Sequence, residues 1–216
     1  MPHRFIRFIF FGNYFVGLLA VILSVETCMQ LSLPLNDVLY YGLLFTAPVI
    51  YYTFAYQKHD VPEIHSNLRS RWYASHYLTI RHSQAIFISS TTLLLFLIVY
   101  KYFNKIIELK LVHYLLMISL ILACSFYYGL VSRKLFGFDL RKTGWLKAFI
   151  IGLVWACCTT ILPLIMLEVE SVDYNFDLRM WLWFFIKNWM FCSVNAIMFD
   201  IKDFRRMPIN SCAPLW

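Results

Sequence analysis

Long apolar stretches alternate with polar connections along the whole chain. Each stretch is roughly 18–23 residues long, and they lie at about 8–25, 38–57, 83–100, 111–130, 145–167 and 180–199. A helix of this length, rising about 1.5 Å per residue, crosses a hydrocarbon core about 30 Å thick. No alternating pattern indicates a barrel of strands. The pattern therefore predicts an all-α fold, a polytopic membrane helical bundle of about six transmembrane helices.

Composition excludes an ordinary soluble domain. The chain of 216 residues is 61% hydrophobic and 14% charged, whereas soluble domains have about 25% charged residues. Gly and Pro number seven each, which excludes collagen-like and disordered classes. The first stretch is not expected to be a signal peptide, because no small-residue cleavage site follows it.

The distribution of basic residues predicts the orientation in the membrane. Connections on one side of the predicted bundle carry 14 Lys and Arg residues, and those on the other side carry four, namely Lys101, Lys105, Lys110 and Arg179. Since cytoplasmic connections are enriched in Lys and Arg, both termini are expected in the cytoplasm, with the protein in the cell inner (cytoplasmic) membrane. The net charge of +7 follows from this rule and requires no nucleic-acid partner.

Neither the histidines nor the cysteines indicate a metal site. The connection 58–82 is the longest, and loops of this length are usually functional or disordered. Its four histidines are spaced like no common pair of metal ligands and favour a solvated interfacial loop. Five of the six cysteines fall inside apolar stretches and are interpreted as small hydrophobic residues.

The most specific cluster of polar residues lies at the end of the sixth stretch. Asp200 and Asp203 stand three residues apart and share one face of a helix, with Asn195 about one and a half turns earlier. Carboxylates placed in this way supply the hard oxygen ligands that Mg²⁺ prefers. The alternative is that Asp200 pairs with basic neighbours, namely Lys202, Arg205 or Arg206. Spacing alone leaves both interpretations open.

At these residues the sequence resembles the UbiA family of intramembrane prenyltransferases. The second acidic motif of that family has the form D-x-x-D-x-x-x-D and follows the sixth helix, and Asp200-Ile-Lys-Asp203 is similar to its first half. The pair Arg141-Lys142 resembles the basic pair that precedes the fifth helix of the family and contacts diphosphate. The family also has a long connection after its second helix. The likeness covers about residues 13–205, and we take 1–205 as the transmembrane domain.

Several positions depart from the family pattern. The first motif of the family, N-x-x-x-D-x-x-x-D, has no counterpart in 51–60, where Asp60 and Glu63 are the possible acidic substitutes. Met207 stands where the third acid of the second motif is expected. The family fold has about nine helices, so six make it incomplete. Because 206–216 looks like an unrelated, divergent cytoplasmic tail, the sequence suggests a short, C-terminally truncated or frame-shifted member.

The resemblance implies transfer of an isoprenyl group from a Mg²⁺-bound isoprenyl diphosphate to an aromatic or similar acceptor, with an incomplete active site. Asp200 and Asp203 would hold the metal, and basic residues would bind the diphosphate, namely Arg141, Lys142 and Lys202. Tyr56 and Asn195 would line the cavity. The alternative is a non-catalytic multi-pass protein that keeps the scaffold and binds an isoprenoid lipid or a partner helix. The expected partners are therefore isoprenyl diphosphate and the lipid bilayer.

Overall fold

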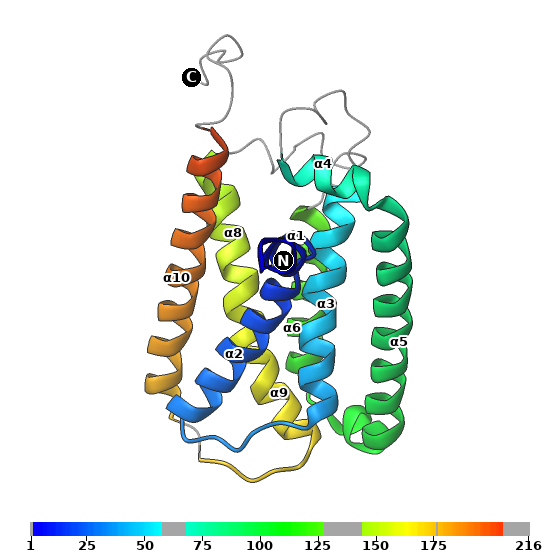
Figure 1. The fold of residues 1–216 in the computed structure, drawn as a ribbon. Coiled ribbons are helices and arrows are strands. Elements are labelled where there is room, and N and C mark those ends of the chain that lie inside the picture. Colours follow the sequence, from blue (N-terminus) through cyan, green and yellow to red (C-terminus); the bar gives the residue numbers. More distant parts are fainter. Residues whose placement is uncertain (1, 58–67, 128–143, 176, 205–216) are drawn as a thin grey trace. The chain divides into compact units, whose positions relative to one another are not determined.

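The structure is a computed structural model that describes residues 2–57, 68–127, 144–175 and 177–204, and every regular element in these ranges is helical. The elements are α1 (Pro2–Phe11), α2 (Tyr14–Gln30), α3 (Val38–Gln57), α4 (Leu68–Ser75), α5 (Tyr77–Glu108), α6 (Leu111–Tyr127), α8 (Gly144–Ala156), the π-helix η3 (Cys157–Ile161), α9 (Leu162–Val169) and α10 (Leu178–Phe204) (Figure 1). The all-helical prediction is confirmed for these residues.

The chain forms two compact units. The first contains Met1–Leu111 and Leu162–Phe176, and the second contains Val112–Ile161 and Asp177–Trp216. The first unit therefore holds α1 to α5 and α9. The second holds α6, α8, η3 and α10.

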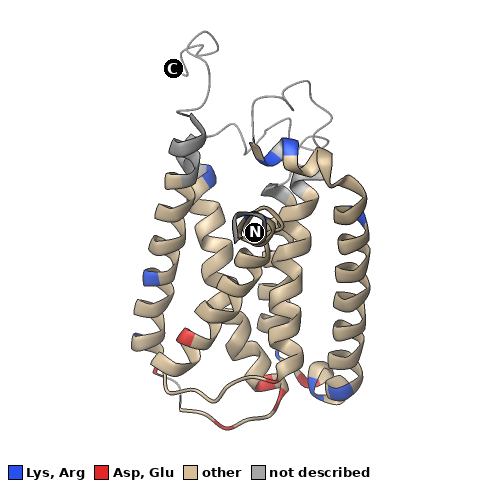
Figure 2. Ribbon diagram, viewed as in Figure 1, with Lys and Arg blue, Asp and Glu red and all other residues tan. Residues whose placement is uncertain are grey.

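Two helices of the described part are long and apolar enough to cross a membrane. They are Tyr77–Glu108 and Lys147–Val169, and a third span results if the bent pair Phe5–Phe11 and Tyr14–Gln30 counts as one. Within α5, residues 82–100 contain no Lys, Arg, Asp or Glu, and Figure 2 shows this stretch of the helix without charged residues. These apolar helices indicate a membrane protein.

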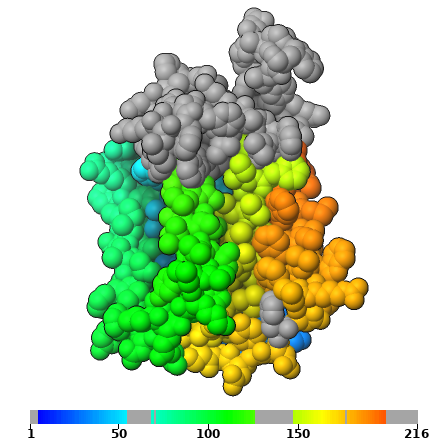
Figure 3. Space-filling view, turned by 180° about the vertical axis from the view of Figure 1, so that it is seen from behind, coloured from blue at the N-terminus to red at the C-terminus, as the bar shows by residue number. Residues whose placement is uncertain are grey.

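The surface of α6 agrees with a lipid environment. This helix is too short to count as a span within its described residues, but its outer side chains are large, apolar and exposed, namely Val112, Leu115, Ile118, Ile121 and Leu122. Figure 3 shows α6 as a green column on the surface of the second unit. In water such a surface would favour association, whereas in a bilayer it faces acyl chains.

The structure divides the first predicted helix in two. The sequence predicts one helix over 8–25, but α1 and α2 meet at an angle of 67°. Asn13, between them, has a φ of 63° and so lies in the left-handed region. A non-glycine residue in this conformation ends a regular helix, which is why the apolar stretch does not continue straight.

The structure also shortens the long connection predicted at 58–82. Residues 68–75 form α4, and α5 begins at Tyr77, while 58–67 lie outside the described residues. Hydropathy does not predict α4, because four of its eight residues are Arg or Ser. Tyr73 is buried and Arg71 is exposed. The buried side anchors α4 to the first unit.

Glycines allow close packing of helices within each unit. A Cβ atom at Gly17 of α2 would lie 2.5 Å from the carbonyl oxygen of Phe45 in α3. In the second unit, a Cβ atom at Gly152 of α8 would lie 2.9 Å from the carbonyl oxygen of Trp189 in α10 and would also clash with Ser193. Small residues that let two backbones approach are typical of helix contacts in membranes, where the hydrophobic effect does not drive helices together.

We predict that Gly17→Ala lowers the free energy of unfolding by about 1–3 kcal/mol, the usual cost of overpacking, because the new methyl group meets backbone that cannot move away. Gly42→Ala in α3 is the matched control. Its Cβ would meet Leu94 Cδ1 at 3.1 Å, the end of a flexible side chain, so this variant should be unchanged or more stable by up to about 1 kcal/mol. Equilibrium unfolding in detergent micelles measures both. Equal losses in the two variants would contradict the packing argument.

Candidate functional site

The two acids at the end of α10 lie on one face of the helix. Because α10 remains helical through Phe204, the backbones of Asp200 and Asp203 lie within its last turns, about one turn apart. Lys202 lies between them in the same helix. The structure describes the backbone of these three residues and not their side chains. The helical register that the sequence predicts for the acidic pair is therefore present.

Asn195, the predicted cavity residue of α10, is half-buried and bonded to its own helix. Its Nδ2 atom donates a hydrogen bond to the carbonyl oxygen of Phe191 at 3.0 Å. Eight residues of helix separate Asn195 from Asp203, which places them about 80° apart around the axis. Asn195 lies about 140° from Asp200 around the same axis, so it is not on the helix face that the two acids share.

The remaining predicted site residues are not brought together by the described structure. Arg141 and Lys142 lie outside the described residues, as do Asp60 and Glu63. The backbone of Tyr56 belongs to α3, and its side chain is not described. Within the described ranges, no group of three His, Cys, Asp or Glu side chains is placed to hold a metal.

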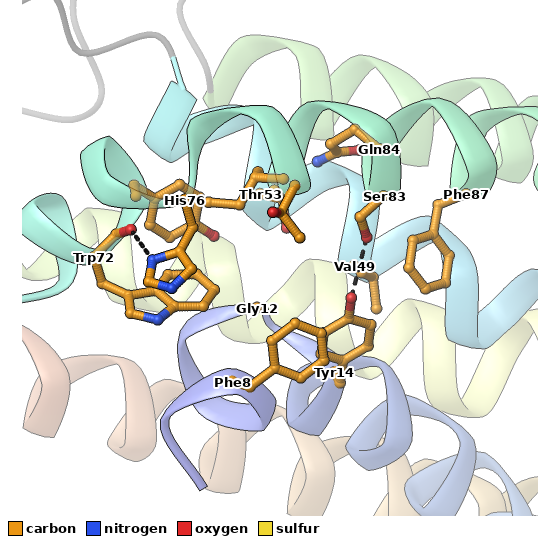
Figure 4. A pocket seen from close by; sticks show the side chains of 13 residues that line it. Phe8, Gly12, Tyr14, Val49, Thr53, Trp72, His76, Ser83, Gln84 and Phe87 are labelled. Atoms are coloured by element: carbon orange, nitrogen blue, oxygen red, sulfur yellow. Dashed lines mark hydrogen bonds between the residues drawn. The ribbon is translucent and has the colours of Figure 1, made fainter. Parts of the chain in front are cut away.

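A pocket that the sequence did not predict lies in the first unit. It has a volume of about 30 Å³ and is lined by residues of α1, the bend, α2, α3, α4 and α5 (Figure 4). Phe8 and Tyr14 are stacked with ring centroids 5.0 Å apart, and the ring of Phe87 lies 5.7 Å from that of Tyr14. The pocket therefore has aromatic walls on the side of the bend.

Polar groups also line this pocket. The hydroxyls of Tyr14 and Ser83 are hydrogen-bonded at 3.0 Å. The ring of His76 stacks on that of Trp72, with centroids 4.9 Å apart, and its Nδ1 atom lies 3.0 Å from the carbonyl oxygen of Trp72 (Figure 4). Gln84 is buried and also lines the pocket. Aromatic rings and hydrogen-bonding groups thus meet in one small space.

A buried hydrogen-bond network holds the bend beside the pocket. Asn13 is 1% exposed, and its Nδ2 atom donates to Thr53 Oγ1 at 3.0 Å and to the hydroxyl of Tyr73 at 3.2 Å. Arg69 donates to Asn13 Oδ1 and, at 3.2 Å, to the carbonyl oxygen of Phe11. Tyr73 donates to the same carbonyl oxygen at 2.8 Å. The last carbonyls of a helix have no partner within it, so α4 supplies the donors that the end of α1 lacks.

A second polar cluster fixes the opposite end of α3. The carboxylate of Asp37 accepts hydrogen bonds from the backbone N–H of Leu39 at 3.0 Å, from Lys101, and from the hydroxyl of Tyr102 at 2.9 Å. The hydrogen bond from Lys101, followed by that from Leu39, lowers the pKa of Asp37 to about 2. The backbone N–H of Asp37 donates to Glu170 Oε1 at 2.9 Å, while partial burial raises the pKa of Glu170. This cluster joins the start of α3 to α5 and to the segment after α9.

Comparison with protein-family models, with curated proteins and with solved structures finds no match for this chain.

Two features near the pocket and the Asp37 cluster do have signals in the sequence, namely the bend after α1 and the start of α3. Gly12-Asn13 interrupts an apolar stretch, and this pair of residue types is common where a helix ends in the left-handed conformation. Asp37 directly precedes an apolar stretch, which is typical of a helix N-cap. The pocket has no such signal, because its residues come from the helices α1 to α5, from the bend between α1 and α2 and from the junction of α4 with α5, and share no spacing.

We predict that Tyr73→Phe lowers the free energy of unfolding by about 1–3 kcal/mol. The change leaves the carbonyl oxygen of Phe11 and the buried side-chain amide of Asn13 short of one hydrogen bond each. Tyr77→Phe is the matched control, since Tyr77 is 54% exposed. Thermal or denaturant unfolding in detergent, followed by circular dichroism, measures both variants. An equally small change in the two would show that the network does not stabilise the bend.

Proposed function

We propose that the chain is an integral membrane protein that crosses the bilayer six times, with both termini in the cytoplasm. The six spans would be α1 with α2, α3, α5, α6, the continuous α8–η3–α9, and α10. In favour of this proposal, the six apolar stretches of the sequence are helical in their described parts, apart from the bend between Phe11 and Tyr14 in the first. The asymmetric distribution of Lys and Arg sets the orientation.

We further propose that the protein is a UbiA-like prenyltransferase that binds a Mg²⁺-bound isoprenyl diphosphate at the end of α10. One observation carries this proposal: α10 stays helical through Phe204, so Asp200 and Asp203 lie one turn apart on one face. A pair of carboxylates in that register is a suitable donor set for Mg²⁺, which commonly bridges one or two carboxylates to substrate phosphates. The resemblance of Asp200-Ile-Lys-Asp203 to the family motif supports the same assignment.

Each group of residues then has a distinct role. Asp200 and Asp203 would hold Mg²⁺, which would supply positive charge to the leaving diphosphate. Arg141, Lys142 and Lys202 neutralise the charge that develops as the diphosphate departs. Tyr56 and Asn195 belong to the cavity wall, where an aromatic face favours an allylic cation and exclusion of water protects it. The acceptor is an aromatic or similar nucleophile.

A non-catalytic role is the second candidate, and a specific observation favours it. Met207 replaces the third acid of the motif, and no Asn-based first motif precedes residue 60. A protein with only two clear acids would still keep the apolar helices and could bind an isoprenoid lipid or a partner helix without ionising a diphosphate. The two candidates differ in whether metal-dependent binding occurs.

The decisive experiment measures binding of a labelled isoprenyl diphosphate to the purified protein in detergent, with and without Mg²⁺. We expect Mg²⁺-dependent binding in the wild type and at least about a tenfold loss, about 1.4 kcal/mol, in Asp200→Asn and in Asp203→Asn. Asp173→Asn, which changes an exposed acid outside the proposed site, serves as the matched control and should bind like the wild type.

Two results would overturn the prenyltransferase proposal. Binding that does not depend on Mg²⁺, or that is equal in all four proteins, would favour the non-catalytic scaffold. If metal-dependent binding is found, release of diphosphate on addition of aromatic acceptors tests the transfer step itself.

A further inference from the structure

One polar atom of the aromatic-walled pocket has no partner. Gln84 is 8% exposed, and its Nε2 atom donates a hydrogen bond to the carbonyl oxygen of Ile50 at 3.3 Å. Its Oε1 atom is buried and accepts no hydrogen bond from the described part of the chain. Buried side-chain carbonyls are nearly always hydrogen-bonded, to protein or to ordered water. The pocket therefore lacks one hydrogen-bond donor.

The neighbouring hydroxyls define what that donor must be. Tyr14 and Ser83 share one hydrogen bond, and two hydroxyls carry two protons, so one proton of the pair remains for a further acceptor. A group that serves both Gln84 and this pair must donate one hydrogen bond and accept another. A hydroxyl group does both, whereas an ammonium group only donates and a carboxylate only accepts.

The size of the pocket sets the second limit. Its volume of about 30 Å³ exceeds the 10–15 Å³ or so that one water molecule needs, and is far below the 150 Å³ or so of a cavity that binds benzene. A hydroxyl group fits, and an aromatic ring does not. The rim includes the exposed residues His76 and Thr79, so a group can enter where α4 meets α5.

We propose that Gln84 Oε1 and the Tyr14–Ser83 pair form a binding site for one hydroxyl group, supplied by water or by a hydroxyl-bearing lipid headgroup. The stacked rings of Phe8 and Tyr14 form the apolar wall of this site. The bound hydroxyl satisfies a polar side chain that the apolar surroundings would otherwise leave unpaired. This inference is independent of the proposed prenyltransferase activity, since it involves no residue of α10.

The chain allows a direct test because it contains only three glutamines, Gln30, Gln57 and Gln84. Glutamine side chains labelled with ¹⁵N would be observed by NMR in perdeuterated micelles of a phosphocholine detergent that has no hydroxyl, and Gln84→Met would assign the signals. We expect cross-peaks between the Gln84 side-chain amide protons and water. For a water molecule held at the site, these cross-peaks have opposite signs in laboratory-frame (NOE) and rotating-frame (ROE) spectra. Direct exchange of the amide protons with water gives cross-peaks of the same sign in both spectra, so it can be distinguished from binding.

A second arm distinguishes the two sources of the hydroxyl. A phosphatidylglycerol with protonated headgroup carbons is added to the same micelles. Persistence of the water signal identifies water, and its replacement by cross-peaks to the headgroup C–H protons identifies the lipid. Absence of both signals from Gln84 in the wild type would overturn the proposal.

Ser83→Ala supplies a variant that keeps Gln84 in place. It removes one partner of the bound hydroxyl, so the cross-relaxation signal of Gln84 should be lost or weakened. Ser89→Ala is the matched control, because Ser89 is an exposed serine of the same helix, outside the pocket. An unchanged Gln84 signal in Ser83→Ala would contradict the assigned geometry.

Discussion

The constraint on which the rest of the structure depends is that backbone groups in an apolar surrounding must find partners without water. An unbroken helix pairs its backbone groups within itself, whereas a broken helix leaves some of them without a partner at the break. At the bend between α1 and α2, Arg69 and Tyr73 donate to the carbonyl of Phe11. In the second unit, Trp181 Nε1 donates to the carbonyl oxygen of Thr160 in the π-helix at 3.1 Å. Both of these irregular points are thus paired with a donor from another segment.

The bend also explains why the first unit contains a pocket. In a straight helix, Phe8 and Tyr14 would project about 120° apart around the axis, whereas the left-handed Asn13 turns α1 away from α2 and places both rings against each other. Because α4 supplies the donors for the bend, it is held across this end of the unit, where Trp72 of α4 and His76, directly after α4, line the pocket. One conformational irregularity therefore generates both the network and the cavity.

Much of the fold could be predicted from the sequence, and the reasons for success and failure are physical. Long apolar stretches determine helices almost by themselves, so α3, α6 and α10 begin within two residues of their predicted starts. The bend at Asn13 and the short helix α4 depend on tertiary hydrogen bonds, which hydropathy does not record. In the candidate site, the helical register of Asp200 and Asp203 follows from spacing alone. The role of Gln84 could not be predicted, since it depends on which atoms Ile50, Tyr14 and Ser83 bring near it.

The central claim is that this chain is a six-span membrane protein, and mapping its topology tests the claim most directly. Alkaline phosphatase and green fluorescent protein would be fused in parallel after Ser32, Gln57, Lys110, Asp173 and Phe204 in a bacterial host. The account predicts active phosphatase after Ser32, Lys110 and Asp173, and fluorescence after Gln57 and Phe204. Fluorescence at all five positions, or an alternation that implies only two or three crossings, would contradict it.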